Sequence, residues 1–142
     1  MTIAAILAGK GRDVISITAH QNLSEAVALL ADRRIGAVPV MDGGQVVGIF
    51  SERDVIHALS SQGAEALDRK VGDVMTSPAI TVSPSEAVIG ALSLMTRRRI
   101  RHLPVVEGGR VIGVVSIGDL VKYRIDRIEA DAEAMRSYIQ SA

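Results

Sequence analysis

The spacing of apolar residues between positions 17 and 59 predicts an ordered series of short elements. Leu23, Ala26, Val27 and Leu30 recur at helical steps, and Asn22 or Ser24 is suited to cap the start of that helix. Two apolar runs follow, at residues 37–41 and 45–50, and read as strands. Asp, Gly and Gly between them favour a tight hairpin turn. A second helix is expected from residue 51 through 59.

The same pattern occurs twice. Residues 17–56 align without a gap on residues 82–121, at a constant shift of 65, and 13 of the 40 aligned pairs are identical. Most of the other pairs exchange one aliphatic residue for another, so the core pattern is duplicated as well. A short strand is expected before each unit, at 14–17 and at 80–82. Each unit is therefore predicted to be β-α-β-β-α.

One such unit cannot cover both faces of its small sheet. Two units packed sheet to sheet would bury one continuous aliphatic core, which predicts an α+β disc with pseudo-twofold symmetry and clefts where the units meet. We expect repeat 1 at residues 1–65, repeat 2 at 66–125 and a helical extension at 126–142. Residues 3–7 lead into the first unit and residues 71–75 into the second.

The C-terminal segment from Leu120 to Ile139 has apolar residues at steps of three and four, with charged residues on the other faces. This pattern predicts one long amphipathic helix that needs an apolar surface to lie on. Two placements stay open: the helix packs on its own disc, or it docks on another subunit. A homodimer is the expected assembly.

Composition removes several classes of function. The 142 residues include no Cys, which excludes disulfides, thiolate catalysis and Cys-based metal sites. Sixteen basic residues balance sixteen acidic ones and aromatic residues make up 2%, so nucleic acid is an improbable partner. The apolar stretch 3–8 is too short for a signal peptide and no window is long enough to span a membrane. We therefore expect a cytoplasmic protein.

Four segments carry a resemblance to a known family. They are residues 35–40 and 100–105, which contain the two Pro-Val pairs, and residues 48–54 and 113–119, which contain the two Ser-x-x-Asp motifs. These features resemble the CBS (cystathionine-β-synthase) domain pair, or Bateman module, in its short stand-alone bacterial form. The match spans nearly all of residues 3–125, so no attached enzyme or channel is expected. The resemblance implies a regulatory module that binds an adenine nucleotide, with AMP, ADP, ATP and NAD(H) all open as the ligand.

The Ser-x-x-Asp motifs at 51–54 and 116–119 have two interpretations. At a helix start, Ser and Asp can cap each other's backbone N–H groups, and this structural role explains the spacing fully. The same helix start also suits a phosphate, and a carboxylate can accept hydrogen bonds from ribose hydroxyls. The resemblance implies that Asp54 or Asp119 holds ribose, with Ser51 or Ser116 beside it.

The two units differ just before their Pro-Val strands. Gly36 and Ala37 leave space that suits a flat purine, whereas Arg101 and His102 are donors suited to phosphate oxygens. A solvated arginine and a histidine without a ligand are the alternatives. Lys10 and Arg12 could reach ligand phosphates or could belong to a mobile basic loop. The full set expected to contact the ligand is Lys10, Ile17, Thr18, Gly36, Ala37, Pro39, Ser51, Arg53, Asp54, Thr81, Arg99, Arg101, His102, Pro104, Ser116, Ile117, Gly118 and Asp119.

The sequence shows no nucleophile beside a base, no converging acid pair and no metal-ligand spacing among its three histidines. We therefore expect no catalytic residue, no metal and no catalytic cofactor. The leading hypothesis is a nucleotide sensor that reports to an unidentified protein partner. The alternative is a constitutive interaction or dimerisation module with vestigial clefts. A nucleic-acid-linked regulator, suggested only by the arginines of residues 97–101, is the weakest candidate.

Overall fold

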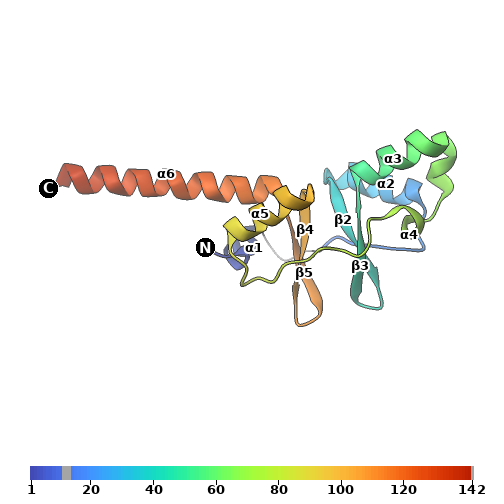
Figure 1. Cartoon of the computed structure of the whole chain (residues 1–142), viewed down its shortest axis with the longest axis horizontal. Helices are drawn as coiled ribbons and strands as arrows, with labels where there is room; N and C mark the ends of the chain where they lie inside the picture. Colours follow the sequence, from blue (N-terminus) through green and yellow to red (C-terminus); the bar gives the residue numbers. More distant parts are fainter. Residues whose placement is uncertain (11–13, 142) are drawn as a thin grey trace.

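The computed structural model describes residues 1–10 and 14–141 of the chain. In chain order the elements are α1 (Ile3–Lys10), β1 (Ile17–Thr18), α2 (Leu23–Arg33), β2 (Ala37–Asp42), β3 (Gln45–Ser51), α3 (Glu52–Gln62), the 3₁₀ helix η1 (Gly63–Asp68), α4 (Val71–Val74), α5 (Val88–Arg98), β4 (His102–Glu107), β5 (Arg110–Ser116) and α6 (Ile117–Ser141). Figure 1 shows two similar lobes side by side, with α6 extending away from the second. The predicted α+β class and C-terminal helix are confirmed.

The two hairpins are the clearest repeat in the fold. The antiparallel pair β2 and β3 runs from Ala37 opposite Ser51, and β4 and β5 run from His102 opposite Ser116, in the same register with a bulge at the same place. Both Gly-Gly turns have positive φ, from 58° to 84°, which glycine adopts without steric cost. The predicted order of helix, strand, turn, strand and helix is confirmed in both units.

The short strands expected before each unit are smaller than predicted. In the first unit only Ile17 and Thr18 pair with β2, in parallel, and in the second only Val82 forms a bridge, to Val105. Proline explains where pairing stops. Pro39 and Pro104 each come one residue before the residue of β2 or β4 that pairs with the short strand. Because proline has no N–H, it cannot donate the next hydrogen bond of this ladder, so the short strand does not extend toward its own N-terminus.

Buried side chains form two clusters, one per lobe, instead of the single continuous core that the repeat predicted. In the second cluster Ile3, Ile6 and Leu7 of α1 pack with Met95 and Leu103. The helix that leads into the first unit thus completes the second. The backbone joins them too, since the N–H of Ile3 donates to the carbonyl of Glu86 at 2.9 Å.

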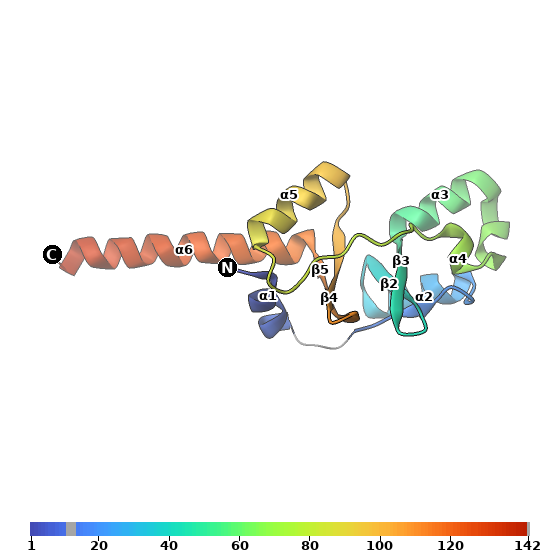
Figure 2. The ribbon, with the colours of Figure 1, turned by 60° about the horizontal axis from the view of Figure 1, so that its bottom comes forward.

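The first cluster receives the matching segment from the linker. Val71 of α4 and Ala66 of η1 are fully buried there with Leu23, Val38 and Phe50. Figure 2, turned from the first view, shows α4 beside the first lobe and α1 beside the second. The core of each lobe is therefore completed by the segment that leads into the other unit: α1 for the second lobe, and η1 with α4 for the first.

Helix α6 packs on the body only at its start. Leu120 is fully buried and Tyr123 packs against the second cluster, whereas every residue from Arg124 to Ser141 is exposed. In both views α6 projects beyond the lobes (Figures 1 and 2). The placement on its own disc is thus wrong for most of the helix. Within the described residues, no helix is both long enough and apolar enough to cross a membrane.

Candidate functional site

Two cavities lie where the lobes meet. The first, the Asp119 cavity, has a volume of about 330 Å³ and is lined by Leu7, Lys10, Val14, Ile15, Arg34, Ile35, Gly36, Ala37, Pro39, His102, Gly113, Val114 and Ser116. The second, the Asp54 cavity, has a volume of about 350 Å³ and is lined by Gly36, Ala37, Ile49, Ser51, Glu52, Arg53, Asp54, Ile56, Thr76, Pro78, Ile80, Ile100, Arg101 and His102. Both volumes are in the range of small-ligand sites.

The cavities are related by the repeat. Val114 and Ser116 line one at the positions that Ile49 and Ser51 occupy in the other, and residues of both units line each cavity. Among the described residues, Gly36, Ala37 and His102 line both. Since these three precede or begin the central hairpins, they form the partition between the two cavities.

Each cavity has a capped helix start at its edge. In α3 the Ser51 side chain accepts from the N–H of Asp54, and the Asp54 carboxylate accepts from the N–H of Ser51 at 2.9 Å. In α6 the N–H of Asp119 donates to Ser116 Oγ at 3.1 Å, and the N–H of Ser116 donates to Asp119 Oδ2 at 2.8 Å. The predicted reciprocal capping is confirmed at both sites.

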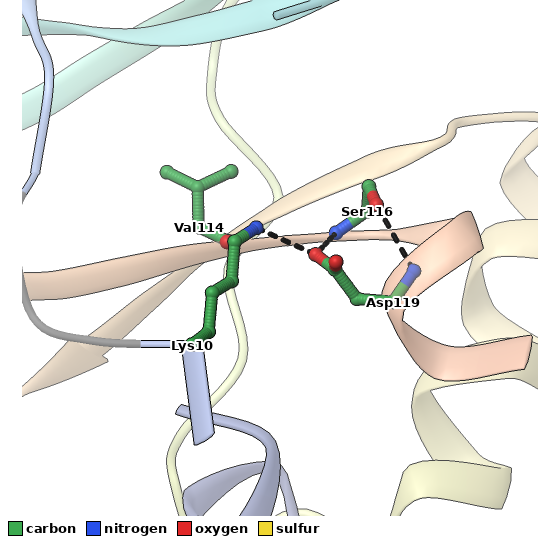
Figure 3. A network of polar contacts seen from close by, with 4 residues as sticks. All are labelled: Lys10, Val114, Ser116 and Asp119. Carbon is green, nitrogen blue, oxygen red and sulfur yellow. Dashed lines mark hydrogen bonds and ion pairs between the residues drawn. The ribbon is translucent and has the colours of Figure 1, made fainter. Parts of the chain in front are cut away.

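Lys10 closes the Asp119 cavity on one side. Its ammonium lies 2.6 Å from Asp119 Oδ2 and 2.9 Å from the carbonyl of Val114, so the end of α1 is tied to β5 and α6 (Figure 3). Burial raises the pKa of Asp119, but hydrogen bonds from Lys10 and Ser116 outweigh it, so the pKa lies below its usual value. Among the described residues, none donates a hydrogen bond to the other oxygen, Oδ1.

The Asp54 cavity is held by different partners. Thr76 donates its hydroxyl to Asp54 Oδ1 at 2.9 Å, while Oδ2 accepts from Ser51. Both carboxylate oxygens are therefore engaged. Across the cavity mouth the guanidinium of Arg53 donates to the carbonyl of Arg99 at 2.9 Å, which links the two lobes.

His102 stands at the partition, against the backbone of Gly36. A Cβ at Gly36 would lie 3.2 Å from the His102 ring and 2.8 Å from Glu52 Oε1, so a larger side chain there would displace its neighbours. Burial, followed by the charge of Lys10, lowers the pKa of His102 below 6.5, and the nearby carboxylates Glu52 and Asp119 oppose this only in part. The neutral imidazole can both donate and accept a hydrogen bond.

Comparison with known proteins identifies the repeat. The family model described as the CBS domain matches residues 11–61 and again residues 71–126. The chain belongs to the CBS domain family. It is 34% identical over 148 residues to the mitochondrial CBS domain-containing protein CBSX3 of Arabidopsis thaliana, an alignment covering 98% of this chain and 72% of that protein.

Solved CBS structures share the fold. A CBS-domain containing protein of Agrobacterium tumefaciens superposes with a TM-score of 0.84 at 40% identity, covering 87% of this chain and 92% of that one. The CBS domain pair of protein MJ0100, solved in complex with 5′-methylthioadenosine and S-adenosyl-L-methionine, superposes with a TM-score of 0.79 at 25% identity, covering 89% and 98%.

Ten of the residues expected at the ligand line the two CBS cavities, and Asp119 is bonded to wall residues. At the Asp119 cavity lie Lys10, Pro39 and Ser116, with Asp119 bonded to two of them; at the Asp54 cavity lie Ser51, Arg53, Asp54 and Arg101; and Gly36, Ala37 and His102 line both. Arg12 lies outside the described residues.

Eight of the expected residues are not part of either cavity wall: Ile17, Thr18, Thr81, Arg99, Pro104, Ile117, Gly118 and Asp119, of which Asp119 is bonded to the wall residues Lys10 and Ser116. Ile17 is 3% exposed because it packs in the first core cluster. Ile117 packs against the second cluster, and Pro104 is buried in β4, opposite Val114 of β5. Arg99 ends α5 in the left-handed conformation. Its carbonyl, and not its side chain, accepts the hydrogen bond from Arg53, which lines the Asp54 cavity.

The sequence interpretation also missed wall residues. Arg34 and Ile15 line the Asp119 cavity, and Thr76, Pro78 and Ile80 line the Asp54 cavity. The repeat alignment contained a signal for the first, because Arg34 is the counterpart of Arg99 at the shift of 65. Both arginines end a helix with a positive φ, 53° and 55°, so they are equivalent in backbone and differ only in what faces them.

The two cavities differ in charge. Among the residues that the structure describes, the walls of the Asp119 cavity contribute Lys10 and Arg34, and one carboxylate, that of Asp119, is bonded at its edge. The walls of the Asp54 cavity contribute two arginines and two carboxylates, together with five Ile and Pro side chains. An anionic ligand is therefore better matched to the Asp119 cavity.

Proposed function

We propose that this CBS domain pair is a non-catalytic sensor that binds an adenine nucleotide in the Asp119 cavity. The observation that carries the proposal is the carboxylate of Asp119, which is bonded to the wall residues Lys10 and Ser116 through Oδ2 and whose Oδ1 accepts no hydrogen bond from any residue that the structure describes. Arg34 adds a second cation to the same walls. A carboxylate whose pKa lies below its usual value stays ionised and can accept hydrogen bonds from ribose hydroxyls.

The other walls suit the rest of such a ligand. Gly36 and Ala37 leave room for a flat base beside Val14 and Ile15, and Lys10 and Arg34 are donors for phosphate oxygens. The adenosyl compounds bound by the MJ0100 pair support the adenosine portion of the ligand. Among AMP, ADP, ATP and NAD(H), the two cations favour a compound with phosphate over one without.

The position of Asp119 supports a regulatory role. It is the third residue of α6, the helix that leaves the body, so a ligand held by its carboxylate contacts the first turn of that helix. Binding changes an equilibrium only through different affinity for two states. In this proposal the two states differ in the contact between Lys10 of α1 and Asp119 at the start of α6. A protein partner binds one of the two states in preference to the other.

Calorimetric titration tests the proposal. AMP, ADP, ATP, NAD⁺ and NADH are each titrated into nucleotide-free protein, with 5′-methylthioadenosine as the phosphate-free comparison. We expect saturable heat with at least one nucleotide, a loss of about tenfold or more in affinity for Asp119→Ala, and a small change for the matched variant Asp54→Ala. Lys10→Ala should weaken the nucleotide more than 5′-methylthioadenosine.

No heat with any nucleotide would overturn the proposal and favour a constitutive interaction module with vestigial clefts. Equal loss in both aspartate variants would reject the choice of cavity while keeping the adenine ligand. Far-UV circular dichroism of each variant, recorded before titration, shows that the fold is retained.

A further inference from the structure

The exposed face of α6 has the repeat of a coiled coil. Its apolar residues alternate in steps of four and three without a break, at Val121, Ile125, Ile128, Ala132, Met135 and Ile139. These are the a and d positions of three successive heptads, with Ile125, Ala132 and Ile139 at a. A stripe restricted to a and d is the narrow seam of a coiled coil and not the broader face of a helix packed on a globular core.

No part of the described chain covers this seam. Val121 is 42% exposed, and exposure rises through Ile125 at 49% and Ile128 at 54% to Ile139 at 65%. The body instead contacts α6 through Leu120 and Tyr123, which lie on a different side of the helix. The seam therefore stays accessible along its whole length while the helix is anchored to its own lobe.

Charges beside the seam identify the occupant and its direction. In a parallel pair, each g residue faces the e residue five positions later on the other helix. Arg124 would face Glu129 of a second copy, and Asp131 would face Arg136, so both contacts join opposite charges. Each contact occurs twice in a symmetric pair. The seam is thus complementary to itself.

The antiparallel arrangement has the opposite balance. There g faces g and e faces e, so Asp131 and Glu129 would each face their own copies and Lys122 would face Arg136. All three contacts join like charges. Within one helix Arg136 already pairs with Glu133 at 2.8 Å, but both side chains are about two-thirds exposed, so this pair is weak and can be exchanged.

We propose that two copies of this chain associate through α6 as a parallel two-stranded coiled coil. The two lobe pairs then lie at the same end of the coil, both attached through the α6 start that contains Asp119. This assembly depends on α6 alone and is independent of whether a nucleotide binds.

Disulfide trapping of the full-length chain tests the direction. The chain has no Cys, so Ile139→Cys introduces a single thiol at the last a position. In a parallel pair the two thiols are neighbours, whereas in an antiparallel pair they are separated by about 27 Å along the coil. Ser137→Cys, two residues earlier on the outer face, is the matched control. Under mild oxidation we expect covalent dimer from Ile139→Cys, at least about tenfold faster than from Ser137→Cys.

Charge exchange tests the pairing. Sedimentation equilibrium should give twice the 15.0 kDa of the chain at micromolar concentration. Arg124→Glu and Glu129→Arg each place like charges together, and each should weaken dimerisation about tenfold. The double variant restores opposite charges in a parallel pair and should recover the original affinity. A monomer at all concentrations, equal trapping of both Cys variants, or no recovery in the double variant would overturn the proposal.

Discussion

The residues at the partition illustrate how one position can serve two cavities. Ala37 and His102 are equivalent in the repeat, yet one leaves space and the other fills it with an imidazole. His102 is tolerated because Gly36, the counterpart of Arg101, has no side chain where the ring lies 3.2 Å from a hypothetical Cβ. The glycine of the first unit and the histidine of the second are therefore coupled by packing across the partition.

Protonation of His102 should reduce stability. Because burial lowers its pKa below the ordinary value of 6.5, the unfolded chain takes up a proton at a higher pH than the folded protein does. The unfolded state then binds more protons, so the free energy of unfolding falls as pH decreases from neutrality through the lowered pKa. Urea denaturation at pH 7.5 and 5.0 measures this loss. His102→Gln should make it smaller, and His57→Gln, exposed on α3, should not. Equal effects of both substitutions would contradict the assignment.

At the residue scale, the sequence predicted hydrogen bonds between residues close in the chain better than it predicted which side chains face a cavity. The capping of Ser51 with Asp54 and Ser116 with Asp119 depends on three-residue spacing, which the sequence contains. Whether Arg34 or Arg99 faces a cavity depends on which element lies opposite, and no spacing encodes that. Lys10 was expected near phosphates, and its contact with Asp119 over 109 residues of chain required the fold.

At the scale of elements, the docking of α1 on the second lobe is the feature that the sequence did not predict. Ile3, Ile6 and Leu7 mark a buried helix face, but the pattern does not say which lobe buries it. Gly113 shows how close the contact is, because a Cβ there would lie 2.6 Å from Leu7 Cδ2. The absence of a side chain in the middle of β5 is thus what lets α1 approach the sheet.

Gly113→Ala should therefore lower the free energy of unfolding by about 1–3 kcal/mol, since the added methyl overpacks a buried contact. Gly9→Ala is the matched control within α1, because nothing lies within 4 Å of its hypothetical Cβ and alanine favours a helix. It should be neutral or stabilise by up to ~1 kcal/mol. Chemical denaturation of both variants measures the difference. Equal stability of Gly113→Ala and the parent would mean that the end of the Leu7 side chain moves aside without cost, so that this contact does not limit the approach of α1 to β5.

At the scale of the whole molecule, the repeat predicted two units and two clefts, but not the division of the core. The clusters stay separate because residues that line the cavities, among them Gly36 and His102, lie between the lobes. The tail was predicted as a helix from its periodicity alone. Its projection from the body follows from packing that ends at Tyr123, a fact about neighbours that the sequence of the tail does not contain.

Deleting residues 126–142 separates the stability of the lobes from that of the assembly. The last residues that pack in a core cluster are Leu120 and Tyr123, so the deletion leaves both clusters complete. At low concentration the truncated and full-length proteins should melt within a few degrees of each other. A dimer gains stability by mass action, so the melting temperature of the full-length chain should rise with protein concentration, while that of the truncated chain should stay constant. Scanning calorimetry over about a hundredfold range of concentration measures this. If the melting temperatures of both proteins rise equally with concentration, the dimer interface lies on the lobes and not on α6. If the truncated protein fails to fold, the exposed part of α6 stabilises its own lobes.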